Sequence, residues 1–128
     1  MNGKHLILDC YGISGDSVND KDRIFSFLEK LVSQIGMEIF YGPIVKPCYD
    51  KWNEGISGFV MITTSHISIH IWPEKEYLSF DCYSCKDFSE NIVIDKVRKE
   101  FQPEEILVQS IIREMNYTRK NDEFWLAK

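Results

Sequence analysis

Two stretches of the chain carry most of the side chains that could do chemistry. They are residues 65–74, with the sequence SHISIHIWPE, and residues 81–85, with the sequence DCYSC. Alternate residues of a β-strand share a face, so the isoleucines of the first stretch would face a core. The opposite face would then carry His66, Ser68, His70 and Trp72. Polar groups are costly to bury without partners, so the pattern predicts a functional site.

Apolar runs and turn residues predict the elements that hold these stretches in place. Strands are expected at residues 5–11, 37–45, 56–64, 66–72, 77–83 and 106–112, and helices at residues 20–34 and 92–101. Gly36 should end the first helix, residues 73–76 form a turn, and residues 47–55 form a loop that could face a ligand. No element is expected in the charged tail from Tyr117.

The order of these elements predicts an α/β (α+β) fold built as a two-layer sandwich. A mainly antiparallel sheet would carry both helices on one face. The other face would lack cover within one chain. A second copy of the chain is the simplest cover, so a homodimer that packs through the sheet is expected.

Length and charge limit the class of protein. The 128 residues are enough for a single domain over 1–128, and the net charge of −5 argues against nucleic-acid binding. No run approaches the ~20 apolar residues of a membrane span, and no signal peptide is evident, so a cytoplasmic protein is expected. The cysteines are too few and scattered for a disulfide scaffold; they are Cys10, Cys48, Cys82 and Cys85.

Two histidines and two cysteines raise the question of a zinc site. Cys82 and Cys85 are three residues apart, so they would face opposite sides of a regular strand. His66 and His70 would share a face but lie ~13 Å apart at ~3.3 Å per residue. This spacing disfavours a shared ion, and no metal is expected.

The order of the residues resembles the small prokaryotic S-adenosylmethionine decarboxylases. That family carries Ser-His-x-x-Ile-His-x-Trp-Pro-Glu, with an acidic residue and a cysteine on the next strand. It also has Gly-x-His-Leu near the N-terminus and a Ser-Gly step before the Ser-His. The matching residues here are 3–6, 57–58, 65–74 and 81–85. The resemblance covers most of the chain in the right order.

By this resemblance, Ser65 is the precursor of a pyruvoyl cofactor. Its hydroxyl would attack the carbonyl of Thr64, and elimination would divide the chain into two pieces of 64 residues each. The ketone would bind the substrate amine as a Schiff base and accept the electrons of decarboxylation. The family usually has Glu before this serine, whereas this chain has Thr64.

The resemblance also implies roles for other residues. Ser57 and His70 would assist maturation, and Cys85 would be the acid that reprotonates the decarboxylated carbon. The substrate would be bound by Asp9, Trp72 and Glu74. The structural alternatives are a hydrogen-bonded strand histidine, a turn serine, a buried thiol and a turn glutamate.

The distances along a strand limit whether Ser57, Ser65 and His70 of one chain can act together. Ser57 and Ser65 would lie ~26 Å apart in one straight strand, and His70 would lie ~16 Å from Ser65. Either the strand bends sharply, most plausibly at Gly58, or Ser57 and His70 serve the Ser65 of a partner chain. The second arrangement is a homodimer with shared sites.

The resemblance thus implies a pyruvoyl-dependent S-adenosylmethionine decarboxylase that supplies aminopropyl groups for polyamine (spermidine) synthesis. One alternative is a pyruvoyl decarboxylase of another cationic amino acid, because the motifs perform the reaction and do not select the substrate. Another is an unprocessed homologue that binds S-adenosylmethionine without decarboxylating it. Thr64 is the residue that keeps this second alternative open.

Overall fold

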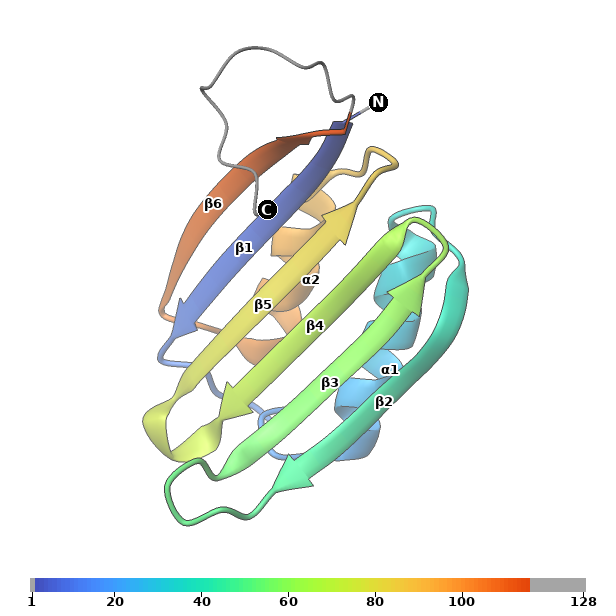
Figure 1. Cartoon of the computed structure of the whole chain (residues 1–128). Coiled ribbons are helices and arrows are strands. Elements are labelled where there is room, and N and C mark those ends of the chain that lie inside the picture. Colours follow the sequence, from blue (N-terminus) through green and yellow to red (C-terminus); the bar gives the residue numbers. More distant parts are fainter. Residues whose placement is uncertain (1, 116–128) are drawn as a thin grey trace, which may run out of the picture.

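The computed structural model describes residues 2–115, and the tail expected from Tyr117 lies outside the described residues. The described strands form one antiparallel sheet in the order β2-β3-β4-β5-β1-β6 (Figure 1). They are β1 (Asn2–Tyr11), β2 (Ile39–Cys48), β3 (Gly55–Ile62), β4 (Ser65–Trp72), β5 (Tyr77–Ser84) and β6 (Glu105–Glu114). The helices are α1 (Lys21–Gln34) and α2 (Glu90–Phe101), and a 3-10 turn (Pro73–Lys75) joins β4 to β5.

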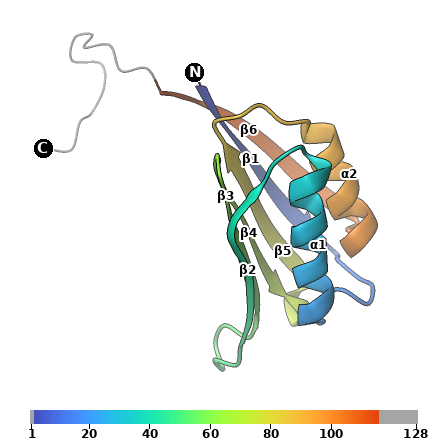
Figure 2. The ribbon, with the colours of Figure 1, turned by 90° about the vertical axis from the view of Figure 1, so that its right-hand side faces the viewer.

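Both helices lie on the same face of the sheet (Figure 2). Each helix buries one apolar stripe against it, which comprises Ile24, Phe27, Leu28, Leu31 and Val32 of α1 and Val93, Val97 and Phe101 of α2. The predicted sandwich of an antiparallel sheet and two helices is therefore confirmed. Within residues 2–115, no element covers the opposite face, which we call the open face.

Local capping explains where the helices begin and end. The Asp20 side chain accepts hydrogen bonds from the backbone N–H groups of Asp22 and Arg23 at the start of α1. Gly36 follows the helix with a φ of +74°, a conformation that glycine adopts without steric cost. Ser89 caps α2 in the same way as Asp20 caps α1. This helix begins at Glu90, two residues before the predicted start, because Ser89 caps it there. The prediction missed Glu90 and Asn91 because polar residues add nothing to the apolar periodicity.

The predicted faces of β4 are also confirmed. In β4, Ile67, Ile69 and Ile71 are buried beneath the helices, whereas the residues between them lie on the open face. The next strand, β5, alternates in the same manner, with Leu78, Phe80, Cys82 and Ser84 on the buried side. No helix of the described part of the chain is long and apolar enough to cross a membrane.

Phe80 is fully buried in β5, in the interior of the sheet. We expect Phe80→Ala to lower the free energy of unfolding by about 3–5 kcal/mol, because it removes a large side chain and leaves a cavity. Ile92→Ala, on the partly exposed side of α2, should cost less than about 1.5 kcal/mol. Urea denaturation of both variants at one protein concentration, in a Ser65→Ala chain that stays in one piece, measures the difference. Equal losses would contradict this assignment of the core.

Candidate active site

The peptide bond between Thr64 and Ser65 lies where the β3–β4 hairpin turns back on itself. Ser65 has a φ of 155°, a value that side-chain-bearing residues rarely adopt and that stores strain when the surroundings enforce it. The backbone N–H of Cys85 donates a hydrogen bond to the Thr64 carbonyl oxygen at 3.0 Å. The peptide bond is therefore both strained and polarised.

Side chains also hold this turn. The Ser84 hydroxyl donates to Thr64 Oγ1 at 2.8 Å, and Thr64 Oγ1 donates to Met37 Sδ at 3.4 Å. The backbone N–H of Thr63 donates to the Glu38 carbonyl oxygen at 3.1 Å. The turn is thus attached on one side to the end of β5 and on the other to the α1–β2 connection.

Ser57 and His70 face each other across the β3–β4 ladder. Ser57 Oγ and His70 Nδ1 share a hydrogen bond of 2.8 Å on the open face, where the His70 ring is exposed to solvent. A histidine with one ring nitrogen held by a hydroxyl has its other nitrogen, Nε2, available for proton transfer. The sequence placed both residues on strands, but only the register of the ladder brings them together.

The strand bend at Gly58, one of the two alternatives set out above, is absent. The β3–β4 ladder keeps one register from Ile56 opposite Ile71 to Ile62 opposite Ser65. Ser57 and Ser65 do not share one strand, as the ~26 Å estimate assumed, because the turn at residues 63–64 separates β3 from β4. His70 is still five residues along β4 from Ser65, which is ~16 Å at ~3.3 Å per residue. Within one chain, the Ser57–His70 pair and the Thr64–Ser65 peptide are therefore two separate groups.

Aromatic rings form a row across β4, β5 and β1 on the open face, next to His70. Tyr77 stacks on Trp72 and on Tyr11, with ring centroids 5.3 Å apart in each case. The His70 ring continues the row, 6.1 Å from that of Trp72. Such a row is an aromatic surface that a planar ligand could contact on the open face.

Two polar contacts hold Tyr77 and Trp72, the inner members of this row. The Tyr77 hydroxyl donates to Asp9 Oδ1 at 2.5 Å, and Trp72 Nε1 donates to Asn53 Oδ1 at 2.6 Å. The hydrogen bond to Asp9, reinforced by burial, raises the pKa of Tyr77 well above its usual value, so the phenol stays protonated. The structure thus brings the predicted residues Asp9 and Trp72 into one row with His70. Tyr77 and Asn53 were missed, because their part depends on cross-strand pairing and on a loop contact.

A second open-face cluster joins His66 to residues of β1, β3 and β5, and the sequence did not predict these contacts. His5 Nε2 lies 2.9 Å from Asp81 Oδ1. The His66 ring lies between those of Phe59 and Tyr83, with centroid distances of 5.7 and 5.9 Å. Burial, together with the nearby His5, lowers the pKa of His66. A neutral His66 is suited to a packed aromatic surface.

The two cysteines of the second stretch have different surroundings. Cys82 is fully buried on the helix side, and this burial raises the pKa of its thiol to about 12. Cys85 lies just beyond the end of β5, is partly exposed, and contacts the Thr64 carbonyl through its backbone. Only Cys85 is thus beside the strained peptide. In residues 2–115, no group of three or more His, Cys, Asp or Glu side chains is arranged to hold a metal ion.

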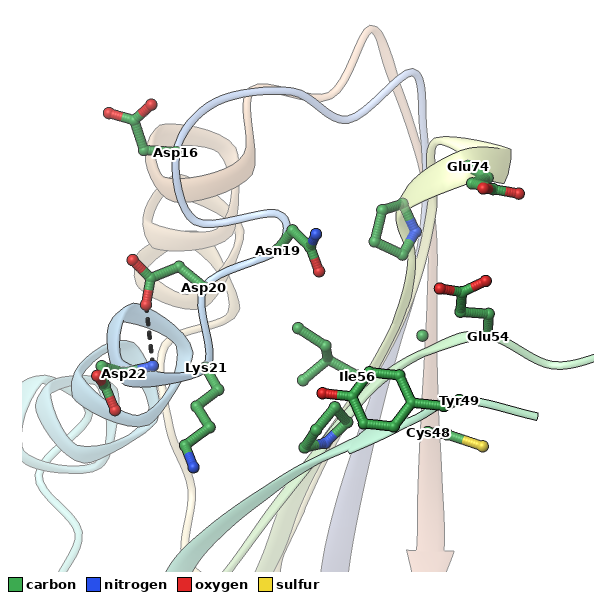
Figure 3. A pocket seen from close by; sticks show the side chains of 13 residues that line it. Asp16, Asn19, Asp20, Lys21, Asp22, Cys48, Tyr49, Glu54, Ile56 and Glu74 are labelled. Atoms are coloured by element: carbon green, nitrogen blue, oxygen red, sulfur yellow. Dashed lines mark hydrogen bonds between the residues drawn. The ribbon is translucent and has the colours of Figure 1, made fainter. Parts of the chain in front are cut away.

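Glu74 is separated from Ser65 by the whole length of β4. It lines a hollow of about 670 Å³ between the start of α1, the end of β2 and the 3-10 turn (Figure 3). Carboxylates dominate the lining, from Asp16, Asp20, Asp22, Glu54 and Glu74. The structure therefore does not bring Glu74 together with Ser65 and Cys85 of the same chain.

The geometry can be compared with that of known proteins. A sequence model of the S-adenosylmethionine decarboxylase family matches residues 4–114. The S-adenosylmethionine decarboxylase proenzyme of Clostridium botulinum (strain Langeland) is 27% identical over 113 residues, which are 88% of this chain and 94% of that protein. The proenzyme of Methanococcus maripaludis (strain C5) is 30% identical over 112 residues, 87% and 88% of the two chains.

A solved structure agrees with the sequence matches. The crystal structure of the adenosylmethionine decarboxylase from Aquifex aeolicus superposes with a TM-score of 0.77 at 27% sequence identity. The match covers 94% of this chain and 97% of the other. Sequence and fold agree over nearly the same residues, including both stretches that carry the candidate site, and the chain therefore belongs to the prokaryotic S-adenosylmethionine decarboxylase proenzyme family.

Proposed function

We propose that this chain is a pyruvoyl-dependent S-adenosylmethionine decarboxylase that cleaves itself between Thr64 and Ser65. The observation that carries the proposal is the state of that peptide bond. It combines the unusual φ of Ser65 with a backbone donor, the Cys85 N–H, on the Thr64 carbonyl oxygen. Strain at the bond and a donor on its oxygen both favour attack on the carbonyl.

In the proposed maturation, Ser65 Oγ attacks the carbonyl carbon of Thr64. The C–N bond breaks as an ester C–O bond forms, and the hydroxyl proton ends on the nitrogen of Ser65. Negative charge develops on the Thr64 oxygen during the attack, where the Cys85 N–H already donates. Removal of the Cα proton of Ser65 then expels the Thr64 carboxylate, and hydrolysis releases the nitrogen as ammonia and leaves the pyruvoyl group.

His70 is the proposed base for removal of the Cα proton, acting in a homodimer. Its ~16 Å separation from Ser65 along β4, and the hydrogen bond that holds it to Ser57, prevent it from acting within its own chain. Two open faces can pack ~10 Å apart about a two-fold axis perpendicular to the strands. This axis would lie between the two faces. If it runs above the point of β4 midway between Ser65 and His70, His70 of the partner subunit lies opposite Ser65.

The same residues account for the proposed decarboxylation. The pyruvoyl ketone supplies the electron sink when substrate is bound to it. Cys85, next to the cleavage position, holds the proton that returns to the decarboxylated carbon. In the homodimer, like His70, the aromatic side chains of Trp72 and Tyr77 of the partner subunit contact the adenine ring, while Asp9 and Glu74 of the partner subunit attract the positive charge of the substrate. The product would serve as a donor of aminopropyl groups for polyamine synthesis.

The first prediction concerns maturation. Wild-type protein should give two bands near half of 15.1 kDa in denaturing electrophoresis, whereas Ser65→Ala should give one full-length band because the attacking hydroxyl is missing. Ser33→Ala, on the exposed surface of α1, should be cut like the wild type. Intact mass spectrometry of each chain identifies the junction. A wild-type chain that stays whole after long incubation contradicts the proposal and favours an unprocessed protein that only binds S-adenosylmethionine.

The second prediction separates the two neighbouring thiols. Cys85→Ala should leave cleavage largely intact but lower kcat by roughly 10²–10⁴-fold, the usual contribution of a positioned acid. Cys82→Ala should keep a near-normal kcat, since the buried Cys82 thiol faces the helices, although the protein should be less stable. Release of carbon dioxide from S-adenosylmethionine measures both rates. A larger loss from Cys82→Ala would mean that the wrong thiol has been assigned.

The third prediction concerns shared sites. Ser65→Ala and His70→Ala chains should each stay uncut when expressed alone. Co-expressed with different affinity tags, they should form mixed dimers in which the His70→Ala chain is cut at its intact Ser65 by His70 of the partner subunit. Electrophoresis after purification on both tags shows the result. If doubly purified mixed dimers remain whole, the two residues act within one chain.

A further inference from the structure

Ser84 is a buried polar residue in a strand whose other buried side chains are apolar. Its neighbours on the helix side of β5 are Leu78, Phe80 and Cys82, and Ser84 is only 1% exposed. An alanine or valine would satisfy the packing of such a position at no polar cost. The hydroxyl therefore needs a reason to be there.

The hydroxyl is part of a continuous hydrogen-bond chain. The backbone N–H of Lys86 donates to Ser84 Oγ at 3.0 Å, Ser84 Oγ donates to Thr64 Oγ1 at 2.8 Å, and Thr64 Oγ1 donates to Met37 Sδ at 3.4 Å. Each hydroxyl in the chain has a single proton to donate and also accepts one hydrogen bond. Ser84 Oγ also lies 3.9 Å from Met37 Sδ, but its contact with Thr64 Oγ1 is much the shorter one. Ser84 can therefore influence the reaction through the position of Thr64, and not as an acid or base.

Residues 84 and 85 hold Thr64 at two points. The Ser84 side chain holds the Thr64 side chain, and the Cys85 backbone N–H holds the Thr64 carbonyl oxygen. A residue attached at one point can rotate about that attachment, whereas attachment at two points fixes the direction of its carbonyl. From this geometry we propose that Ser84 is a positioning residue for self-cleavage, holding the Thr64 carbonyl against the Cys85 N–H while Ser65 attacks.

This inference rests on the proposed self-cleavage and concerns its first step alone. The reacting carbonyl must keep its donor as charge moves onto the oxygen, since a preorganised donor costs nothing to reorient during the reaction. Loss of the Ser84 hydroxyl would let the turn explore other conformations. Attack by Ser65 would then slow, while the later proton removal by His70 would be unaffected.

Thr64 itself offers a matched pair of variants for the test. Thr64→Val keeps the branched shape and removes the hydroxyl, whereas Thr64→Ser keeps the hydroxyl and removes only a methyl group. Cleavage of freshly translated chains can be followed over time by electrophoresis. It should be roughly three- to tenfold slower in Thr64→Val and in Ser84→Ala, which is the change in rate expected from the loss of about one hydrogen bond. Thr64→Ser should stay within about twofold of the wild type by the same scale.

The double variant Ser84→Ala/Thr64→Val tests whether the two hydroxyls act through the same contact. It should be no slower than the slower single variant, because the hydrogen bond between Ser84 and Thr64, which each substitution removes, can be lost only once. Loss that multiplies in the double variant, or wild-type cleavage in either single variant, would overturn the inference.

A second readout separates positioning from general damage to the fold. In a His70→Ala chain the ester should accumulate, and hydroxylamine should split it at residue 64. Adding Ser84→Ala should lower the fraction of chains that hydroxylamine splits at early times. Urea denaturation midpoints of Ser65→Ala chains, with and without Ser84→Ala, should show that the protein is still folded. An unchanged fraction would overturn the inference alone. Wild-type protein that stays whole would overturn the proposed function and this inference with it.

Discussion

The register of β4 against its two neighbours is the constraint on which the rest of the site depends. On one side it sets Ser57 opposite His70, and on the other it sets Ser65 opposite Ser84. A slip of one residue would turn every isoleucine of β4 towards the open face and every polar side chain into the core. The buried isoleucines therefore fix the positions of the polar groups, and the same packing that stabilises the sheet aligns the chemistry.

Alternation of residue types is a local property, so the sequence was sufficient to predict the faces of β4. The pairing of Ser57 with His70 was not accessible in this way, because it depends on where the hairpin turns. The estimate of one straight strand from Ser57 to Ser65 failed for the same reason: residues 63–64 form a turn although they contain neither glycine nor proline. A hairpin turn without these residues carries a weak sequence signal.

The missed members of the site share a different property. Tyr77 meets Trp72 across β4 and β5, and Asn53 reaches Trp72 from a loop. Ser84 looked like one more small residue at the end of a strand. Each becomes informative only through a contact with a residue distant in sequence. By contrast, Ser65, His70 and Cys85 stood out because their order along the chain matches the motifs of the family that the sequence resembles.

The sheet order has a consequence for a chain cut at residue 64. Residues before the cut supply β1, β2 and β3, and residues after it supply β4, β5 and β6. Because β1 lies between β5 and β6 in the sheet, the two pieces are interleaved and neither can leave without breaking strand pairs on both sides of β1. The halves of a mature protein would thus stay together without a covalent link. Once unfolded, however, they would have to meet again as separate molecules, so recovery would depend on concentration, while the uncut chain could refold alone.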